Sequence, residues 1–283
     1  MAIFKNLNEA ETALVESIVR VSPAAVAFSG GVDSMLLAKA AMIAAERHSL
    51  PFPRAILAVS ATSSADDVEN AYKTAEEIGI SLCRIDTGEL NLPEFVRNGR
   101  DRCYHCKKQR FSEMLELLRV WEKEDGIKRT LLDGENADDL AAYRPGHRAA
   151  EELGVRSPIA DSGINKETVR KLARRWGLSA ADRPSTPCLV TRLAYGITPE
   201  PELLRAVEKA EQLLRRFRFP ICRVRVDLPD SARIEVPAVE ISRLLEADTR
   251  EKIAKGVKAA GFTVVSIDLE GFASGKMDSL AFL

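Results

Sequence analysis

The stretch 24–34, AAVAFSGGVDS, constrains the fold of this 283-residue chain more than any other. Ala24 to Phe28 is a short apolar run typical of a buried strand, and a helical pattern of apolar residues from Met35 to Arg47 follows closely. Gly30 and Gly31 permit a tight turn between the two, because a residue without a Cβ adopts backbone conformations that other residues avoid. The stretch therefore predicts a strand, a tight turn and the N-terminus of a helix.

Such a turn is typical of a phosphate-binding site. Its backbone N–H groups, the hydroxyls of Ser29 and Ser34 and the positive end of the helix dipole would point to one place. Asp33 does not suit phosphate alone, because a carboxylate beside phosphate is unfavourable unless a cation lies between them. We therefore expect Asp33 to bind Mg²⁺ or to form hydrogen bonds within the loop.

The motif SGGVDS resembles the SGGxDS signature of the PP-loop pyrophosphatases. Members of that superfamily cleave ATP between the α and β phosphates and adenylate a substrate, so the resemblance implies ATP and Mg²⁺ as ligands. It also implies a Rossmann-like α/β domain of the adenine nucleotide alpha hydrolase type. The alternative is a glycine-rich turn that only joins a strand to a helix.

Strands alternate with helices after this turn. The ranges Arg54–Ser60, Leu82–Asp86 and Thr130–Asp133 are predicted as strands, and Asp66–Ile78 is predicted as a helix. This alternation indicates a parallel sheet with helices on both faces, whose ligands bind at the carboxyl ends of the strands. The SGGVDS turn lies at such an end.

A second polar segment, DGENADD at 133–139, follows the last of these strands. Its carboxylates would form a second wall around a magnesium pyrophosphate, although a solvated turn that caps the next helix explains the same residues. A similar segment recurs in amidating and thiolating PP-loop enzymes, and Lys166, near the start of a predicted helix at 157–178, resembles a lysine that approaches the nucleotide in them. The resemblance implies Mg²⁺ ligands at Asp33, Asp138 and Asp139, and an ATP site formed by Ser29, Gly30, Gly31, Asp33, Ser34, Ser60, Asn136 and Lys166.

The proline-rich range 182–196, DRPSTPCLVTRLAYG, indicates a boundary between two domains, 1–180 and 181–283. The second is predicted as a smaller α+β domain for substrate binding or oligomerisation. Its expected elements are helices at 201–217, 239–245 and 250–260, paired strands at 221–227 and 232–236, and a final strand at 263–269.

The composition is that of an ordinary soluble enzyme, with 46% hydrophobic and 29% charged residues. The net charge of -1 argues against a strongly basic surface and hence against a stable nucleic-acid partner. The sequence shows neither the apolar core of a signal peptide nor a run long enough to span a membrane. Five cysteines in such a chain favour thiol, metal or sulfur chemistry over disulfides, so we expect a cytoplasmic protein.

Cys103 and Cys106 form a single CxxC motif, which is compatible with half of a zinc site, a redox pair or part of an iron–sulfur site. Zinc would need two further ligands, and no second CxxC exists in the sequence. Together with Cys188 the pair gives three cysteines, the number that holds a [4Fe-4S] cluster with one iron not bound by protein. Cys83 and Cys222 are expected to be buried small hydrophobes, and the same explanation is the alternative for Cys188.

The segments CYHCKK, DGENADD and PSTPCLVTRLAYG together resemble the LarE family, the ATP-dependent sulfur transferases of nickel-pincer nucleotide cofactor synthesis. The resemblance implies a homohexamer that adenylates the carboxylates of pyridinium-3,5-biscarboxylic acid mononucleotide and converts them to thiocarboxylates. In some members the cysteine matching Cys188 gives up its own sulfur, and those members lack the CxxC pair. The presence of Cys103 and Cys106 resembles the three-cysteine branch, in which an iron–sulfur cluster is thought to carry the transferred sulfur.

Several basic residues surround the CxxC motif and suit an anionic substrate, although a solvated face explains them equally well. Lys107 is the preferred member because it directly follows Cys106. Alternating arginines on the paired strands of the second domain are expected to bind the substrate phosphate, with Glu235 orienting one of them. The predicted catalytic residues are Cys188, Asp33 and Lys107, and the predicted substrate-binding residues are Arg192, Arg223, Arg225, Arg233 and Glu235.

Three other functions would use the same nucleotide loop. A PP-loop tRNA thiolase with a [4Fe-4S] cluster shares the adenylation chemistry but predicts tight tRNA binding with a steep salt dependence. Amidating relatives that make NAD or GMP need no sulfur site, so the three cysteines disfavour them. A nucleotide-binding module without activity would bind ATP and release no pyrophosphate.

Overall fold

The computed structural model describes residues 4–141, 145–184 and 186–273, which form two compact units. The first unit comprises 1–60, 65–95 and 101–186, and the second comprises 61–64, 96–100 and 187–283. The sequence places the domain boundary after residue 180, whereas the chain changes unit after residue 186. No helix within the described ranges has both the length and the apolar character of a membrane span.

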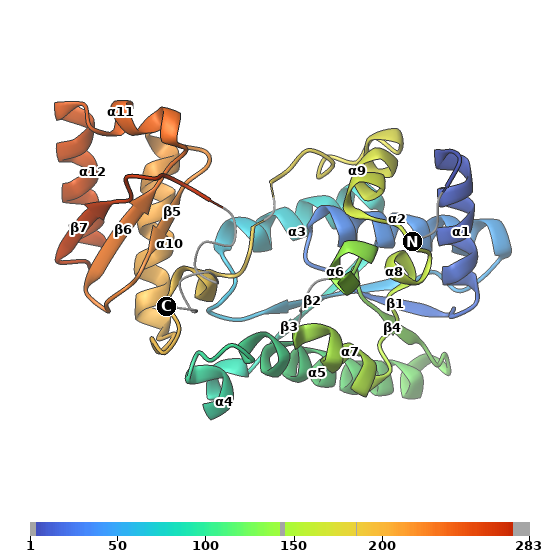
Figure 1. Ribbon diagram of the computed structural model, residues 1–283. Coiled ribbons are helices and arrows are strands. Elements are labelled where there is room, and N and C mark those ends of the chain that lie inside the picture. Colours follow the sequence, from blue (N-terminus) through green and yellow to red (C-terminus); the bar gives the residue numbers. More distant parts are fainter. Residues whose placement is uncertain (1–3, 142–144, 185, 274–283) are drawn as a thin grey trace. The chain divides into compact units, whose positions relative to one another are not determined.

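The first unit contains a four-stranded parallel sheet in the order β3-β2-β1-β4 (Figure 1). The strands are β1 (Ala24–Ala27), β2 (Arg54–Val59), β3 (Ser81–Asp86) and β4 (Thr130–Leu132), which confirms the predicted parallel sheet. The chain adds β2 and then β3 on one side of β1, and it then crosses back to add β4 on the other side of β1. The strand order therefore changes direction between β1 and β4. Ligands of such folds bind at this point, outside the carboxyl ends of the strands.

Alternate residues of the central strands supply two hydrophobic cores, one on each face of the sheet. Val26 and Leu57 belong to one core, and Ala25 and Ile56 belong to the other. The first core is completed by α1 (Leu7–Val19), α2 (Val32–His48), α3 (Ala65–Ile78), α8 (Pro158–Asp161) and α9 (Lys166–Arg175). The second is completed by α5 (Arg102–Asp125) and α7 (Pro145–Leu153), which lie together on the opposite face in Figure 1.

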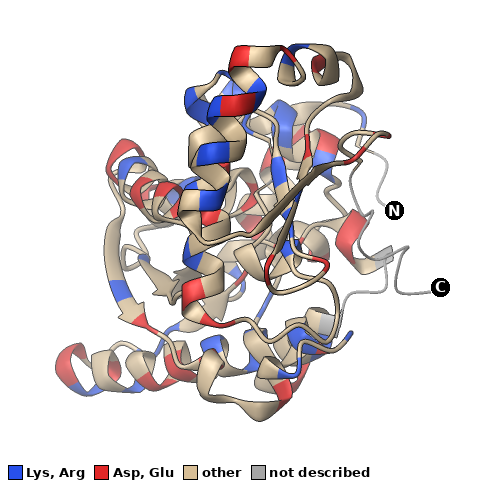
Figure 2. Ribbon diagram, turned by 90° about the vertical axis from the view of Figure 1, so that its left-hand side faces the viewer, with Lys and Arg blue, Asp and Glu red and all other residues tan. Residues whose placement is uncertain are grey.

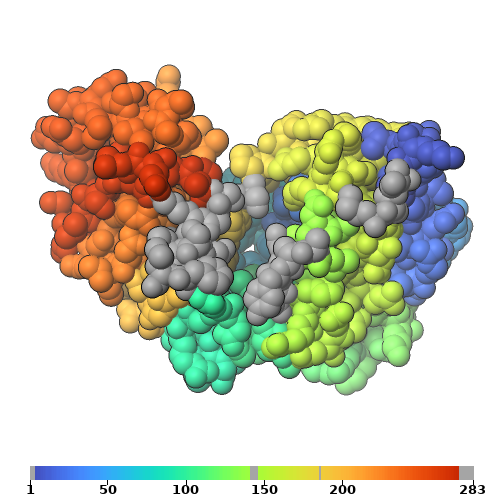
Figure 3. All heavy atoms as spheres, in the orientation of Figure 1, coloured from blue at the N-terminus to red at the C-terminus, as the bar shows by residue number. Residues whose placement is uncertain are grey.

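The second unit contains a three-stranded mixed sheet in the order β5-β6-β7. β5 (Arg223–Arg225) and β6 (Ser231–Glu235) pair with each other, as the sequence predicts, and they are antiparallel, whereas β7 (Val264–Ile267) is parallel to β6. The helices are α10 (Pro201–Arg216), α11 (Ile241–Leu244) and α12 (Ala247–Ala260), with the short turns η2 (Leu189–Arg192) and η3 (Ala238–Glu240). α12 and β7 form part of the outer surface of this unit, coloured orange to red in Figure 3.

Two short segments from earlier in the chain complete the second unit. The buried Asn98 donates from its side-chain amide to the carbonyls of Ala194 (2.9 Å) and Ile197 (2.8 Å). The Leu189 N–H donates to the carbonyl of Thr62 (3.0 Å). The chain therefore enters the second unit twice before residue 187, which the sequence does not indicate.

The predicted helix at 157–178 is two helices, α8 and α9, because a turn with Gly163 at a φ of 72° separates them. The short elements η1 (Glu89–Asn91), α4 (Pro93–Val96) and α6 (Ala137–Ala141) and the helices α5 and α7 lie where the sequence predicted none. α5 is hard to recognise because charged residues predominate, although Phe111, Met114, Leu118 and Trp121 form a buried stripe at helical spacing.

Gly30 must be glycine for two reasons. Its φ is 72°, and a Cβ built on it would lie 2.7 Å from the Cα of Ala71 in α3, where the backbone cannot give way. We expect Gly30→Ala to lower the free energy of unfolding by about 1–2 kcal/mol through its left-handed backbone and by about 1–3 kcal/mol more through the clash. Urea unfolding followed by circular dichroism measures this loss.

Gly79→Ala is the matched control. Gly79 has a φ of 78°, but a Cβ built on it would have nothing within 4 Å, so only the left-handed strain applies. Equal losses in the two variants would contradict the close packing of the loop on α3.

Candidate active site

The SGGVDS loop is held in shape by its two serines. The Ser34 hydroxyl donates to the Gly31 carbonyl (3.0 Å) and accepts from the Ser29 N–H (3.2 Å), and the two hydroxyl oxygens are 3.1 Å apart. Gly31 is the N-cap of α2 and has no side chain to occupy the N–H groups of the first helical turn. The loop therefore has the backbone and hydroxyl donors that an anion of phosphate size requires.

The loop after β4 lies directly against the SGGVDS loop. A Cβ built on Gly134 would lie 3.0 Å from the Ser34 nitrogen, a tight contact that glycine avoids. The Asn136 side-chain amide donates to Asp33 Oδ1 (3.3 Å), and the Lys166 ammonium forms an ion pair with Asp33 Oδ2. The structure thus brings together three of the predicted nucleotide-site residues, Asp33, Asn136 and Lys166, at the carboxyl ends of β1 and β4.

Asp138 and Asp139 stabilise this arrangement by hydrogen bonds to Lys166 and Asn136. Asp138 accepts from the backbone N–H of Lys166 (2.9 Å), and Asp139 accepts from the backbone N–H (3.1 Å) and side-chain amide (2.8 Å) of Asn136. Among the described residues, no group of three or more His, Cys, Asp or Glu is arranged to hold a metal ion. The partly exposed Asp33 carboxylate suits Mg²⁺, which proteins bind through one or two carboxylates together with phosphate oxygens.

Lys107 lies between two buried carboxylates on the other side of the β4 loop. Its ammonium is 3.4 Å from Asp133 Oδ2 and forms an ion pair with Glu135. Its methylene stem passes over Gly146, where a Cβ would lie 2.6 Å from Lys107 Cδ. Burial lowers the pKa of Lys107, but the two carboxylates outweigh burial and raise it. The ammonium is therefore engaged by the protein, next to the CxxC motif.

The carboxylates around Lys107 differ in their pKa. Burial raises the pKa of Asp133, which accepts from the Ser157 hydroxyl (2.6 Å). Burial also opposes ionisation of Glu135, but Lys107 and His147 outweigh it and lower the pKa of Glu135. The hydrogen bond between His147 Nδ1 and Glu135 (2.8 Å) raises the pKa of the imidazole. Lys107 and His147 together compensate the two buried acids.

Ser60, a predicted ATP ligand, belongs to a buried polar cluster at the ends of β2 and β3. It donates to Glu89, which also accepts from the Thr87 hydroxyl (2.7 Å) and from Arg110 on α5 (2.6 Å). Glu89 is fully buried. Burial alone would raise its pKa, but Arg110 and the hydroxyls outweigh burial and lower it. Sequence reasoning missed Glu89, because nothing near it in the chain indicates its partner on α5.

The cysteines fall into two groups. Cys103 and Cys106 lie one turn apart in the first turns of α5, and Cys188, exposed, is the N-cap of η2 in the second unit. Two cysteines at this spacing on one helix face suit two ligands of the same metal cluster. Cys222 is buried, and burial raises the pKa of its thiol to about 12, which agrees with the expectation of an inert residue. Cys83 is half-buried on β3.

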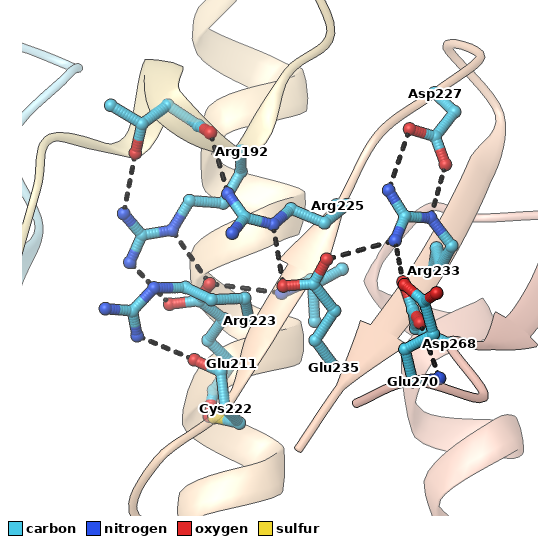
Figure 4. A network of polar contacts seen from close by, with 12 residues as sticks. Arg192, Glu211, Cys222, Arg223, Arg225, Asp227, Arg233, Glu235, Asp268 and Glu270 are labelled. Atoms are coloured by element: carbon cyan, nitrogen blue, oxygen red, sulfur yellow. Dashed lines mark hydrogen bonds and ion pairs between the residues drawn. The ribbon is translucent and has the colours of Figure 1, made fainter. Parts of the chain in front are cut away.

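The arginines predicted to bind substrate form one network in the second unit (Figure 4). Arg192 is 1% exposed and pairs with Glu211. Arg225 pairs with Glu235, which also contacts Arg233. Each of these three guanidinium groups is thus engaged by carboxylates of the protein, and burial excludes Arg192 from direct contact with a ligand.

Arg223 and Arg233 are less deeply buried than the other two arginines of this network. Arg223 donates to the carbonyl of Cys222 (2.7 Å) and lies 5.3 Å from the ring centroid of Phe272. Arg233 also pairs with Asp227 and Asp268. Arg233 is thus held by three carboxylates, whereas Arg223 lies against a carbonyl and an aromatic ring.

Glu211 was missed by sequence reasoning although a signal exists. It lies on the apolar face of α10, in register with Leu204, Val207 and Leu214. A carboxylate at such a position is rarely buried unless a cation pairs with it. The pattern therefore indicates a buried partner but not which arginine supplies it.

We expect Lys107→Met to lower the free energy of unfolding by about 3 kcal/mol, because it leaves the buried Asp133 and Glu135 without their shared cation. Their folded-state pKa values would then lie above those of the unfolded chain. The folded state would bind more protons, so the variant would lose stability as the pH rises from about 4 through the raised pKa values. Urea unfolding between pH 5 and pH 8 measures both effects.

Lys108→Met is the matched control. Lys108 pairs with Glu152 at the surface, where both side chains are more than a third exposed, so its loss should cost at most about 1 kcal/mol. Similar losses in the two variants would contradict a buried ion-pair cluster at Lys107.

Comparisons with known proteins place these features in a family. No protein-family model matches the chain. It is 37% identical over 255 residues to Uncharacterized protein slr1717 of Synechocystis, covering 90% of this chain and 91% of that protein. It is 30% identical over 249 residues to Uncharacterized protein MJ0830 of Methanocaldococcus jannaschii, covering 88% and 90%. A solved structure of the U34-tRNA thiolase NcsA from Methanococcus maripaludis, with its [4Fe-4S] cluster, matches with a TM-score of 0.43 and 18% identity over 63% of this chain and 67% of that one.

A further relative, which has a named activity, is the pyridinium-3,5-bisthiocarboxylic acid mononucleotide synthase of Lactiplantibacillus plantarum. The two sequences are 31% identical over 265 residues, which is 94% of this chain and 92% of that enzyme. The similarity therefore spans both units, including the SGGVDS loop and the Cys188 segment. On this similarity, the chain belongs to the LarE family of PP-loop sulfurtransferases.

Proposed function

We propose that this protein uses ATP to adenylate the carboxylates of pyridinium-3,5-biscarboxylic acid mononucleotide and converts them to thiocarboxylates. The observation that carries the proposal is the meeting of Asp33, Asn136 and Lys166 beside the N-terminus of α2. The 31% identical relative is named for synthesis of the corresponding bisthiocarboxylic acid mononucleotide, which supports this choice of substrate.

The first step activates a poor electrophile. A carboxylate oxygen attacks the α phosphorus of ATP, the bond to the bridging oxygen breaks, and pyrophosphate leaves with the electron pair. The N–H groups of the α2 first turn and the Ser29 hydroxyl bind the pyrophosphate and stabilise its charge, and Ser34 holds the loop in shape through the Gly31 carbonyl. Mg²⁺ bound at Asp33 would neutralise part of that charge. Lys166, held next to Asp33, supplies a further cation.

The second step replaces AMP by sulfur. A sulfur nucleophile attacks the carbonyl carbon of the mixed anhydride, and AMP leaves with the electron pair of the broken bond. Cys103, Cys106 and Cys188 would hold a [4Fe-4S] cluster, which when bound supplies the transferred sulfide. The alternative uses the Cys188 thiolate itself: attack gives a thioester, and loss of the Cys188 α proton then breaks its Cβ–S bond and leaves dehydroalanine.

A small anionic substrate suits the charge of the chain. Lys and Arg positions alternate with Asp and Glu positions along the ribbon in Figure 2, and the net charge is -1. Arg223 is the residue we propose for the substrate phosphate, since it is only half-buried within the arginine network and a guanidinium binds phosphate through paired hydrogen bonds. We further propose that the active form is a homohexamer.

We expect Asp33→Asn to reduce pyrophosphate release from ATP in the presence of the substrate by about 10²-fold or more, because the charge that binds Mg²⁺ and pairs with Lys166 is lost. Asp248→Asn, at an exposed ion pair on α12, is the control and should keep the wild-type rate. Coupled phosphate detection measures both rates. Wild-type pyrophosphate release by Asp33→Asn would contradict the proposed nucleotide site.

The cysteines are tested by anaerobic purification, iron and sulfide analysis and visible spectroscopy. We expect about four irons and matching sulfide per chain, as a [4Fe-4S] cluster requires. Separate serine variants of Cys103, Cys106 and Cys188 should lose both the cluster and sustained turnover, whereas Cys83→Ser should keep them. A wild-type protein without iron after reconstitution, with Cys188 converted to dehydroalanine after one turnover, would instead support the sacrificial route.

A further inference from the structure

We propose that Arg192 and Glu211 are positioning residues that fix the backbone of Cys188 for sulfur transfer, supported by Arg225 and Glu235. This inference rests on the proposed function, in which Cys188 takes part in the second step. It gives the buried arginines a different role from the substrate binding that the sequence predicts for them.

The backbone around Cys188 is held by several donors while the residue itself is exposed. The Cys188 carbonyl accepts from the Thr191 hydroxyl (2.7 Å), the Thr191 N–H (3.0 Å) and Arg192 Nη1 (3.2 Å). Arg192 Nη1 also donates to the Pro187 carbonyl (2.6 Å). The guanidinium therefore binds the peptide groups on both sides of the Cys188 Cα.

Arg192 is itself held by Glu211. Its Nε and Nη2 donate to the two oxygens of that carboxylate (2.9 and 3.1 Å), and both residues are at most 2% exposed. Glu211 also accepts from the backbone N–H of Val224 on β5 (3.1 Å). One carboxylate of α10 thus joins the Cys188 segment to the sheet of the second unit.

A second arginine holds the next turn of the same segment. Arg225 Nη1 donates to the Thr191 carbonyl (2.9 Å), and Arg225 Nε donates to the fully buried Glu235 (3.0 Å). Glu235 is in turn held by Arg233 (3.0 Å). The Cys188 segment is therefore fixed at two points by guanidinium groups, and each of these groups forms an ion pair with a buried carboxylate (Figure 4).

The chemistry of the network indicates positioning rather than stability alone. A buried ion pair is costly to desolvate, and well-packed apolar residues often replace one without loss of stability. Apolar residues, however, offer no donors to the carbonyls of Pro187, Cys188 and Thr191. Lysine has no planar fork and cannot bind a carboxylate through two parallel hydrogen bonds while also reaching these carbonyls. Sulfur transfer needs such a fixed geometry, since reacting atoms must meet within about 3–3.5 Å.

The test measures adenylation and sulfur transfer, the two half-reactions, separately in the Arg192→Lys and Glu211→Gln variants. Arg205→Lys is the control, because Arg205 forms an exposed ion pair with Glu202 on the same helix as Glu211. We expect both test variants to keep the first-turnover release of pyrophosphate and the KM for ATP, but to form thiocarboxylate at least ~10-fold more slowly. Hydrogen–deuterium exchange should be faster at the amides of Leu189 and Thr191, and the control should match the wild type in every measurement.

Two results would overturn the inference. One is a folded Arg192→Lys protein that transfers sulfur at the wild-type rate or exchanges its Leu189 and Thr191 amides as slowly as the wild type. The other is an equal loss of pyrophosphate release and thiocarboxylate formation, which would indicate a general structural role. If Arg192→Lys does not fold, Glu211→Gln decides by the same criteria. A wild-type protein that forms no thiocarboxylate would count against the proposed function, and amide exchange would still test the fixing of the Cys188 segment.

Discussion

The pairing of β1 with β4 is the constraint on which the candidate active site depends. Val26 lies opposite Leu132 in this parallel pair, so the two strands end at the same edge of the sheet. The loops that follow are therefore forced together, and Gly134 allows their backbones to touch. Without this register Asp33 would meet neither Asn136 nor Lys166, since both depend on the loop after β4 for their position.

In both units, cationic side chains pair with buried carboxylates around the segments that carry the cysteines. In the first, Lys107 and Arg110 extend from α5 to the buried acids Glu135 and Glu89. In the second, guanidinium groups lie between buried carboxylates and the carbonyls of the Cys188 segment. Buried charges are unfavourable unless paired, so each cation has few alternative positions. The segments that carry the cysteines are thus attached to the folded core by directional contacts rather than by apolar packing alone.

The sequence was sufficient to predict the sheet and the meeting of the SGGVDS and DGENADD loops at its edge. SGGVDS and DGENADD each follow a strand directly, and parallel strands bring such loops together without further information. Glu89 and Glu211 could not be assigned roles in the same way, because their partners Arg110 and Arg192 are fixed only by tertiary packing. Spacing alone cannot distinguish an arginine that faces a ligand from one that pairs internally, and for this reason Arg192 and Arg225 were predicted to bind substrate.

The second unit includes the segments 61–64 and 96–100, which limits where the chain can be cut into separately folding fragments. A fragment that begins at residue 187 would lack Thr62 and Asn98, and three hydrogen bonds that they make to Leu189, Ala194 and Ile197 would be lost. These bonds lie beside the Cys188 segment in the chain. The two units are therefore not interchangeable modules: recombination or truncation at their apparent boundary would separate the cysteine-bearing part from segments that complete its fold.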